Sequence, residues 1–220
     1  MYGKGEEDQL SETSKTNPIS VYAKSTLEAE QQNLSIADNN FSVTSLRNAT
    51  VFGLSTRMRF DLVVNLMTLT AFQKGRIIVM GGGKQWRPLV HLSDVSNAFI
   101  SVIGSSSSIV NGEIFNIGLD NFQISTLAYL VRDALPIPVE IEMAPDDADK
   151  RDYNVVFDKI KSKIGFKAQK DVVFGINEIY SALKSGKVDV GPKTVTVQWY
   201  RSILEAKSLL DSITLNGRIL

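Results

Sequence analysis

The sequence predicts an α/β fold. Short apolar runs with the length of strands recur along the chain, and longer segments whose apolar residues repeat every three to four positions lie between them. This alternation is typical of a sheet covered by helices. With 220 residues, of which 43% are hydrophobic, the chain is long enough to bury a full core.

The N-terminal part predicts a loop, a helix, a strand and a second loop. Its first residues are polar and contain two glycines, which favours a loop. Asn17 is a good N-cap and Pro18 a good first helical residue, so a helix is expected from there to about residue 33. Residues 41–46 alternate as a strand does, and 48–61 predict a long loop.

The middle of the chain is predicted to alternate between helices and strands. Gly75 ends a helix, and Gly81–Gly83 stop the strand that follows it. Ser93 or Asp94 is expected to cap the next helix. In order, we expect a helix over 62–72, a strand over 76–80, an extended piece over 88–91, a helix to about 103 and a strand over 113–117.

The last third predicts more helices than strands. Asp171 is a suitable N-cap, and the final helix has an apolar face around Trp199, which favours packing against the body. We expect helices over 125–135, 159–164, 171–185 and 194–213, and strands over 139–143 and 154–157.

Composition excludes several classes of function. Lys and Arg together number 24, as do Asp and Glu, so no basic excess indicates a nucleic acid or a membrane surface. The chain has no cysteine and only one histidine, His91, which excludes thiolate and multi-histidine metal sites. No apolar run has the length of a membrane span and the first residues do not resemble a signal peptide, which favours a cytoplasmic protein.

A motif near the N-terminus is the clearest functional signal. Tyr22-Ala-Lys-Ser-Thr26, after Pro18 and Ser20 and before Glu30, resembles the active-site helix of the extended short-chain dehydrogenases/reductases, the NAD-dependent sugar-nucleotide epimerases and dehydratases. Further segments match this family in order: Met1-Tyr2-Gly3, Leu46-Arg47 with Val51-Phe52-Gly53, the block Gly81 to Val95 with Arg87 and His91, and Arg151-x-Tyr153 with Asp158-Lys-Ile and Gly165.

The resemblance implies a fold, a substrate and a cofactor. Residues 1–55 would be the remnant of a doubly wound parallel Rossmann-type sheet, and 56–220 a smaller α/β substrate domain whose segment 90–120 returns to the first part. The implied activity is that of a UDP-glucose 4-epimerase-like epimerase or dehydratase. NAD or NADP is the implied cofactor, and the implied partner is a nucleotide-diphosphate sugar.

The implied catalytic pair departs from the family. There, a tyrosine takes a proton from a sugar hydroxyl, and a lysine one helical turn later favours the phenolate. Tyr22 has the tyrosine position, but Thr26 stands where the lysine is expected and carries no charge. Lys24 is two residues on and points away. An inactivating change, a diverged site and a decayed copy all remain open.

The family's nucleotide-binding half has no counterpart here. No Gly-x-Gly-x-x-Gly follows a strand, since Gly81–Gly83 lead to Trp86 and Pro88 instead of a helix. Only 16 residues precede Asn17. We therefore expect weak or absent NAD binding and an incomplete or inactive enzyme in isolation. The chain could form a homodimer or pair with a chain that supplies the missing half. The alternative function is a non-catalytic module that binds a sugar nucleotide or a partner.

The resemblance also implies substrate contacts. It places Arg87 on the nucleotide diphosphate, against the alternative of a surface arginine stacked on Trp86. Arg57 and Arg59 lie in the loop expected to cover the substrate, and Arg151 resembles a second phosphate or ribose contact. Thr50 stands where many relatives have an asparagine that faces the phosphates.

Two further polar residues are expected to be structural. His91 lies on a buried extended piece near Asp94, which favours a histidine that donates to a carboxylate or a backbone carbonyl. Glu28 and Glu30 predict a solvated helix face.

Overall fold

The computed structural model describes residues 1–3, 7–145, 152–215 and 217–219. Its class is α/β with parallel strands, which confirms the expected class at that level. The helices are α1 (Val21–Ser35), α2 (Val63–Lys74), α3 (Leu92–Ile103), α4 (Ser107–Val110), α5 (Ile124–Ala134), α6 (Asp158–Ile164), α7 (Val172–Lys184) and α8 (Thr196–Ile213), with 3-10 turns η1 (Gly81–Gly83) and η2 (Pro192–Thr194). The strands are β1 (Ser45–Asn48), β2 (Thr50–Phe52), β3 (Arg76–Met80), β4 (Trp86–His91), β5 (Ile114–Ile117), β6 (Asp120–Gln123), β7 (Glu140–Ala144), β8 (Thr214–Leu215) and β9 (Arg218–Ile219).

Parallel pairing joins strands that are distant in the sequence. β1 pairs with β5, β2 with β4 and β3 with β7, all in parallel, while β6 runs antiparallel on β4. In the β1–β5 pair Leu46 lies opposite Phe115. Strand β5 thus pairs with the N-terminal strand β1, while the domain division at residue 55 and the returning segment 90–120 stay predictions.

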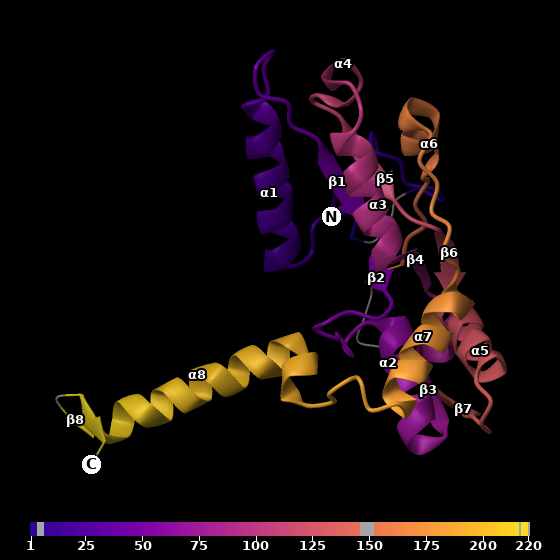
Figure 1. Ribbon diagram of the computed structural model, residues 1–220, viewed down its shortest axis with the longest axis vertical. Coiled ribbons are helices and arrows are strands. Elements are labelled where there is room, and N and C mark those ends of the chain that lie inside the picture. The colour runs from indigo at the N-terminus through magenta and orange to yellow at the C-terminus, as the bar shows by residue number, and fades with distance from the viewer. Residues whose placement is uncertain (4–6, 146–151, 216, 220) are drawn as a thin grey trace.

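The larger core lies where α2, α5 and α7 meet over β3 and β4 (Figure 1). Val64, Ile77, Leu127 and Ile176 are at most 1% exposed there. Gly175 allows α7 to approach closely, because a Cβ at this position would overlap the ring of Phe52. This packing fixes the position of the loop after β2, which carries two of the expected substrate contacts.

A second core surrounds β5. Val90, Ala98, Phe115 and Ile160 bring β4, α3 and α6 together around this strand. Leu46 of β1 packs on the same cluster, so the strand after the Tyr22 helix is fixed from one side by apolar contacts.

The caps of two helices differ from the prediction. Asn17 is not the cap of α1, because its backbone N–H donates to the carbonyl of Met1 (3.0 Å) and holds the segment extended. The helix begins after Ser20, whose Oγ accepts from the N–H of Ala23 (3.1 Å). The cap of α3 is His91, whose Nδ1 accepts from the N–H of Ser93 (3.2 Å).

The strand predictions are wrong in several places. The strand expected over 41–46 begins only at Ser45, and β2 lies inside the predicted loop. β6 was not predicted. Residues 154–157 form no strand, because the backbone of Leu10 and the side chain of Asn121 take up their backbone hydrogen bonds. A single β-bridge joins Val155 to Leu10.

The final helix does not pack as predicted. Figure 1 shows α8 extending away from the body, and none of its residues is buried. Its N-terminal end is attached through η2, where the N–H of Phe60 donates to the carbonyl of Thr194 (2.8 Å). Of the helices described, none combines the length and the hydropathy that a bilayer span requires.

Candidate functional site

A cleft of about 1050 Å³ lies between the start of α1, β1, β2, the loop before α2, β3 and β4. Five of the seven residues expected at the site line it. These residues are Tyr22, Thr26, Thr50, Arg59 and Arg87. The cleft therefore brings together side chains from segments up to 65 positions apart, while their roles stay predictions.

Tyr22 lies at the mouth of the cleft, in the first turn of α1. It is 80% exposed, so its hydroxyl is accessible. The hydroxyl of Thr26 donates to the backbone carbonyl of Tyr22 (2.7 Å), a bond that threonine often forms inside helices. Thr26 therefore supplies no positive charge to this site, and its one hydroxyl proton is already engaged.

Arg59 carries a positive charge on the same cleft. Its Nε and Nη2 donate to the two carboxylate oxygens of Asp61 at 3.1 and 2.9 Å. These bonds raise the pKa of Arg59, partial burial opposes the rise, and the charge of Asp61 and the Tyr22 hydroxyl add to it. Burial alone would raise the pKa of Asp61, but Arg59 outweighs it and holds that pKa below its ordinary value.

Arg87 is buried at the floor of the cleft, with 6% of its surface exposed. Its Nη1 donates to the carbonyl of Trp86 (2.7 Å). The alternative of a surface arginine is therefore wrong, because this residue is almost entirely enclosed. A buried guanidinium that reaches a cleft suits an anionic ligand.

The two remaining candidates do not join this site. Arg57 lines a different cavity, on the other side of the loop that carries Arg59. Arg151 lies outside the described residues. Only one of the two loop arginines therefore faces the cleft, a distinction that spacing in a loop does not reveal.

The sequence does not predict a buried ion pair whose arginine, Arg47, lines the cleft. Arg47 donates to both carboxylate oxygens of Glu30, with its shortest bond from Nη2 to Oε1 (2.6 Å), and Ser45 Oγ donates to Oε2 (2.6 Å). Arg47 Nη1 also donates to the hydroxyl of Tyr2 (2.8 Å), which donates to Oδ1 of Asn116 (2.8 Å). The prediction that Glu30 is solvated is wrong, since 3% of its side chain is exposed.

The charges of this pair support each other. Burial alone would raise the pKa of Glu30, but the hydrogen bonds from Arg47 and Ser45 outweigh it and lower that pKa. Burial would lower the pKa of Arg47, and its bonds to Glu30 and Tyr2 raise it instead. Burial raises the pKa of the Tyr2 hydroxyl despite these bonds. No sequence spacing signals the pair, because its members are 17 residues apart on different elements.

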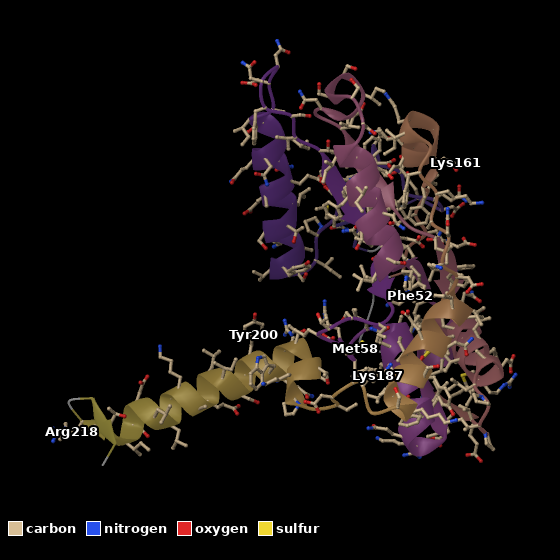
Figure 2. All side chains as sticks on the ribbon, viewed as in Figure 1. Phe52, Met58, Lys161, Lys187, Tyr200 and Arg218 are labelled. Carbon is tan, nitrogen blue, oxygen red and sulfur yellow. The ribbon has the colours of Figure 1, made fainter. Side chains whose placement is uncertain are left out.

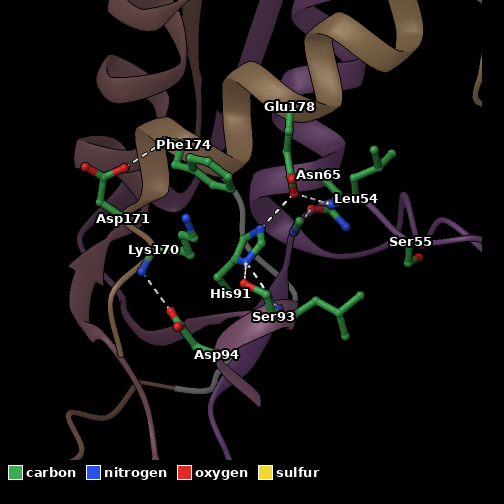
Figure 3. Close-up of polar contacts among 12 residues, drawn as sticks. Leu54, Ser55, Asn65, His91, Ser93, Asp94, Lys170, Asp171, Phe174 and Glu178 are labelled. Atoms are coloured by element: carbon green, nitrogen blue, oxygen red, sulfur yellow. Dashed lines mark hydrogen bonds and ion pairs between the residues drawn. The ribbon is translucent and has the colours of Figure 1, made fainter. Parts of the chain in front are cut away.

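His91 connects β4 to α7 and to the loop after β2 (Figure 3). Because Nδ1 accepts from Ser93, Nε2 carries the proton and donates to Oε1 of Glu178 (2.7 Å). The same oxygen accepts from the N–H of Leu54 (2.6 Å). The carboxylate partner is thus Glu178 and not Asp94, which instead accepts from two backbone N–H groups of the segment before α7.

Glycine at position 53 permits this arrangement. Its φ is +113°, and a Cβ there would overlap the ring of His91. The histidine therefore holds the loop that begins at Gly53, and it does not line the cleft.

The described residues do not fit the pyrophosphate of a dinucleotide. Gly81–Gly83 form a 3-10 turn that leads into a strand, and a Cβ at Gly83 would overlap Val79 and Ser125. Gly83 thus serves close packing, and the three glycines do not form the helix N-terminus that binds phosphates in dinucleotide folds. Among the same residues no cluster of histidine, aspartate and glutamate could hold a metal ion.

Comparison with a family model gives a match over more than half of the chain. Residues 1–118 match the model described as the NAD dependent epimerase/dehydratase family. The matched segment contains Tyr22, Thr50 and Arg87 together with most of the cleft.

Solved structures show the same fold. UDP-glucose 4-epimerase from Thermotoga maritima with UDP-glucose is 22% identical with a TM-score of 0.74, and the match covers 85% of this chain and 61% of that one. RMD from Pseudomonas aeruginosa complexed with NADPH is 20% identical, with a TM-score of 0.73 and coverage of 84% and 64%. dTDP-glucose 4,6-dehydratase from Bacillus anthracis in complex with NAD is 20% identical with a TM-score of 0.69, and the match covers 84% of this chain and 59% of that one. The chain thus spans less than two thirds of the length of these proteins.

Proposed function

Because the chain belongs to the NAD-dependent epimerase/dehydratase family, we propose that its cleft is the substrate side of a sugar-nucleotide epimerase or dehydratase. The observation that carries the proposal is the meeting of Tyr22, Thr50, Arg59 and Arg87 on one cleft. The ligand is a nucleotide-diphosphate sugar such as UDP-glucose, the molecule named with one of the matching structures.

The diphosphate is held by the arginines. A guanidinium donates several hydrogen bonds in one plane and matches the oxygens of a phosphate. Arg87 is buried and held by the carbonyl of Trp86, so it offers a fixed donor at the floor. Arg59 is oriented by Asp61 at the rim, and Thr50 offers one hydroxyl to the same ligand.

Tyr22 takes the position of the proton-transferring residue. Its exposed hydroxyl faces a ligand in the cleft and is the group that exchanges a proton with a sugar hydroxyl. NAD or NADP supplies the hydride acceptor in this family. The described residues do not fit its pyrophosphate, and we propose that a partner chain supplies the cofactor-binding wall.

A non-catalytic module that binds a sugar nucleotide or a partner is the second candidate. Thr26 favours it, because its hydroxyl is bound to the carbonyl of Tyr22 and provides no cation. In this case the ligand binds and the proton transfer does not occur.

Two neighbouring arginines provide a matched test of the binding proposal. Calorimetry with UDP-glucose and, separately, with NAD is carried out on the full chain and on the variants Arg59→Gln and Arg57→Gln. Both variants lose one charge from the same loop, but only Arg59 lines the cleft. We expect at least a tenfold higher Kd for UDP-glucose with Arg59→Gln and an unchanged Kd with Arg57→Gln. No binding by the wild-type chain, or equal losses in both variants, contradicts the proposal.

Thr26→Lys distinguishes the two candidates. The new ammonium stands one helical turn from Tyr22 and favours its ionised form. Turnover of UDP-glucose by this variant, in the presence of NAD and of a chain that supplies the cofactor-binding wall, and its absence from Thr26→Met, support the enzyme. If UDP-glucose binds but neither variant turns it over in that mixture, the non-catalytic module is favoured.

A further inference from the structure

A second cavity, of about 640 Å³, lies apart from the cleft. The loop after β2 and the segment between α7 and α8 form it, and Trp199 in the first turn of α8 closes one wall. Figure 2 labels Met58 and Lys187 near this junction, where α8 leaves the body.

The charged lining is mostly positive. Arg57, Lys187 and Lys193 carry three cations around the cavity against the single carboxylate of Asp189, although the whole chain has a net charge of zero. In the part of the chain that the structure describes, the side chains of Arg57 and Lys187 have no ion pair or hydrogen bond. Cations that no protein carboxylate neutralises favour an anionic ligand.

The lining also contains apolar side chains, among them an aromatic ring. Met58 is 3% exposed and forms part of the floor, and Trp199 is partly buried beside it. The ammonium of Lys193 lies 5.4 Å from the centre of the Trp199 ring. A cavity of this volume is in the range of small-molecule sites and has room for more than a single phosphate group. The ligand therefore has an apolar body as well as a negative charge.

The walls are held in place by contacts that need no ligand. The N–H of Leu54 donates to Glu178 (2.6 Å), and Ser55 Oγ donates to the carbonyl of Arg57 (2.7 Å). Across the cavity the N–H of Phe60 donates to the carbonyl of Thr194 (2.8 Å). A site formed before binding requires less ordering when the ligand arrives.

We propose that this second cavity binds an organic phosphoester that carries an aromatic ring. The phosphate lies among Arg57, Lys187 and Lys193, and the ring lies against Trp199 and Met58. Asp189 accepts a hydrogen bond from a polar N–H or O–H of the same ligand. This site does not depend on the proposed function of the cleft, which has other lining residues.

Trp199 is itself the reporter for the test. The chain has two tryptophans, so the fluorescence of the Trp86→Phe variant comes from Trp199 alone. Phenyl phosphate, inorganic phosphate and phenol are titrated separately into the full chain carrying this change. We expect saturable quenching by phenyl phosphate, with a Kd at least tenfold lower than that of either inorganic phosphate or phenol. Calorimetry on the unaltered chain gives the same Kd if Trp86→Phe has not disturbed the fold.

Two charge variants complete the test. The double variant Arg57→Gln with Lys187→Gln is expected to raise the Kd for phenyl phosphate at least tenfold. The control Lys161→Gln with Lys167→Gln removes the same charge from exposed positions outside both pockets and leaves the Kd unchanged. Absence of binding to the unaltered chain, or equal weakening in both double variants, overturns the proposal. Arg59→Gln, which alters the cleft, leaves the Trp199 signal intact, so failure here and failure of UDP-glucose binding are separate results.

Discussion

Helices α1 and α7 are attached to the body in different ways. α7 buries apolar side chains such as Val172, Ile176 and Ile179 against α2 and α5. In α1 the only buried residue is Glu30, which is held by Arg47, while Tyr22 is exposed. α7 is held by a continuous apolar surface, whereas the buried contact of α1 is polar and joins Glu30 to Arg47 and Ser45.

The difference shows where the candidate site is sensitive. Apolar packing is the sum of many small contacts and varies little with pH or with the loss of one group. A buried ion pair is an all-or-none contact, since removal of one partner leaves an unpaired charge. The helix that carries Tyr22 therefore depends on Glu30 and Arg47, whereas the body that carries Arg87 depends on its core.

The largest expected effect comes from Arg47→Met. Glu30 then remains buried and unpaired, which costs about 4 kcal/mol of the free energy of unfolding. Urea unfolding measures the loss, and hydrogen exchange should show that the amides of α1 lose protection first. The double variant with Glu30→Gln is expected to recover part of the stability. A loss below about 1 kcal/mol with unchanged exchange in α1 would show that the ion pair does not hold this helix.

Leu127→Ala tests the other mode of attachment. Leu127 is fully buried between α5 and its neighbours, and its truncation is expected to cost about 3 kcal/mol through lost burial and a cavity. The same urea and exchange measurements should show reduced protection in α2, α5 and α7 together. Selective loss in α1 alone would contradict the division into two modes.

The helix caps give a smaller and matched comparison. Asp171 Oδ1 accepts from the N–H of Phe174 (2.7 Å) at α7, and Ser20 Oγ accepts from Ala23 at α1. Asp171→Ala is expected to lower the free energy of unfolding by about 1 kcal/mol. Ser20→Ala should raise exchange in the first turn of α1 and leave the unfolding midpoint unchanged, because this turn adds little to the packed body. A shift of the midpoint as large as that of Asp171→Ala would mean that α1 unfolds together with the core.

The smallest effect is expected from mild acid. The pKa of Glu30 is lower in the folded chain than its ordinary value of 4.5, so its contribution is complete above that value and is lost as pH falls through the folded pKa. Protection of α1 should therefore be constant between pH 7 and about 5.5 and decrease only below about 4.5. The Arg47→Met variant should lack this dependence, and a decrease near neutral pH would point to a group other than Glu30.

Part of the fold follows from local sequence. Gly75 ends α2 in the left-handed conformation, Asp171 caps α7, and β3 has the predicted bounds, since each depends on neighbours within a few residues. The predicted cap at Asn17 and the strand over 154–157 were wrong because distant residues, Met1 and Leu10, take up their backbone groups. The apolar face of α8 was visible in the sequence, but whether another surface covers it is not encoded in its periodicity.

The candidate site also has features that local sequence predicts and features that depend on distant residues. The motif around Tyr22 and the segment around Arg87 were recognisable because each is a short local pattern. The sequence does not separate Arg57 from Arg59, because only the folded loop decides which pocket each arginine lines. Glu30 was assigned to solvent because its partner belongs to another element.

Periodicity and short motifs are enough to predict the α/β class, the family and the residue types available to the cleft, because they depend on neighbouring residues. Packing between distant segments sets the burial of Glu30 with Arg47, the hydrogen bond from His91 to Glu178, and the separation of the second cavity from the cleft. Each of these depends on parallel pairing and helix packing between segments far apart along the chain, and no local pattern specifies which distant charge or surface a side chain meets.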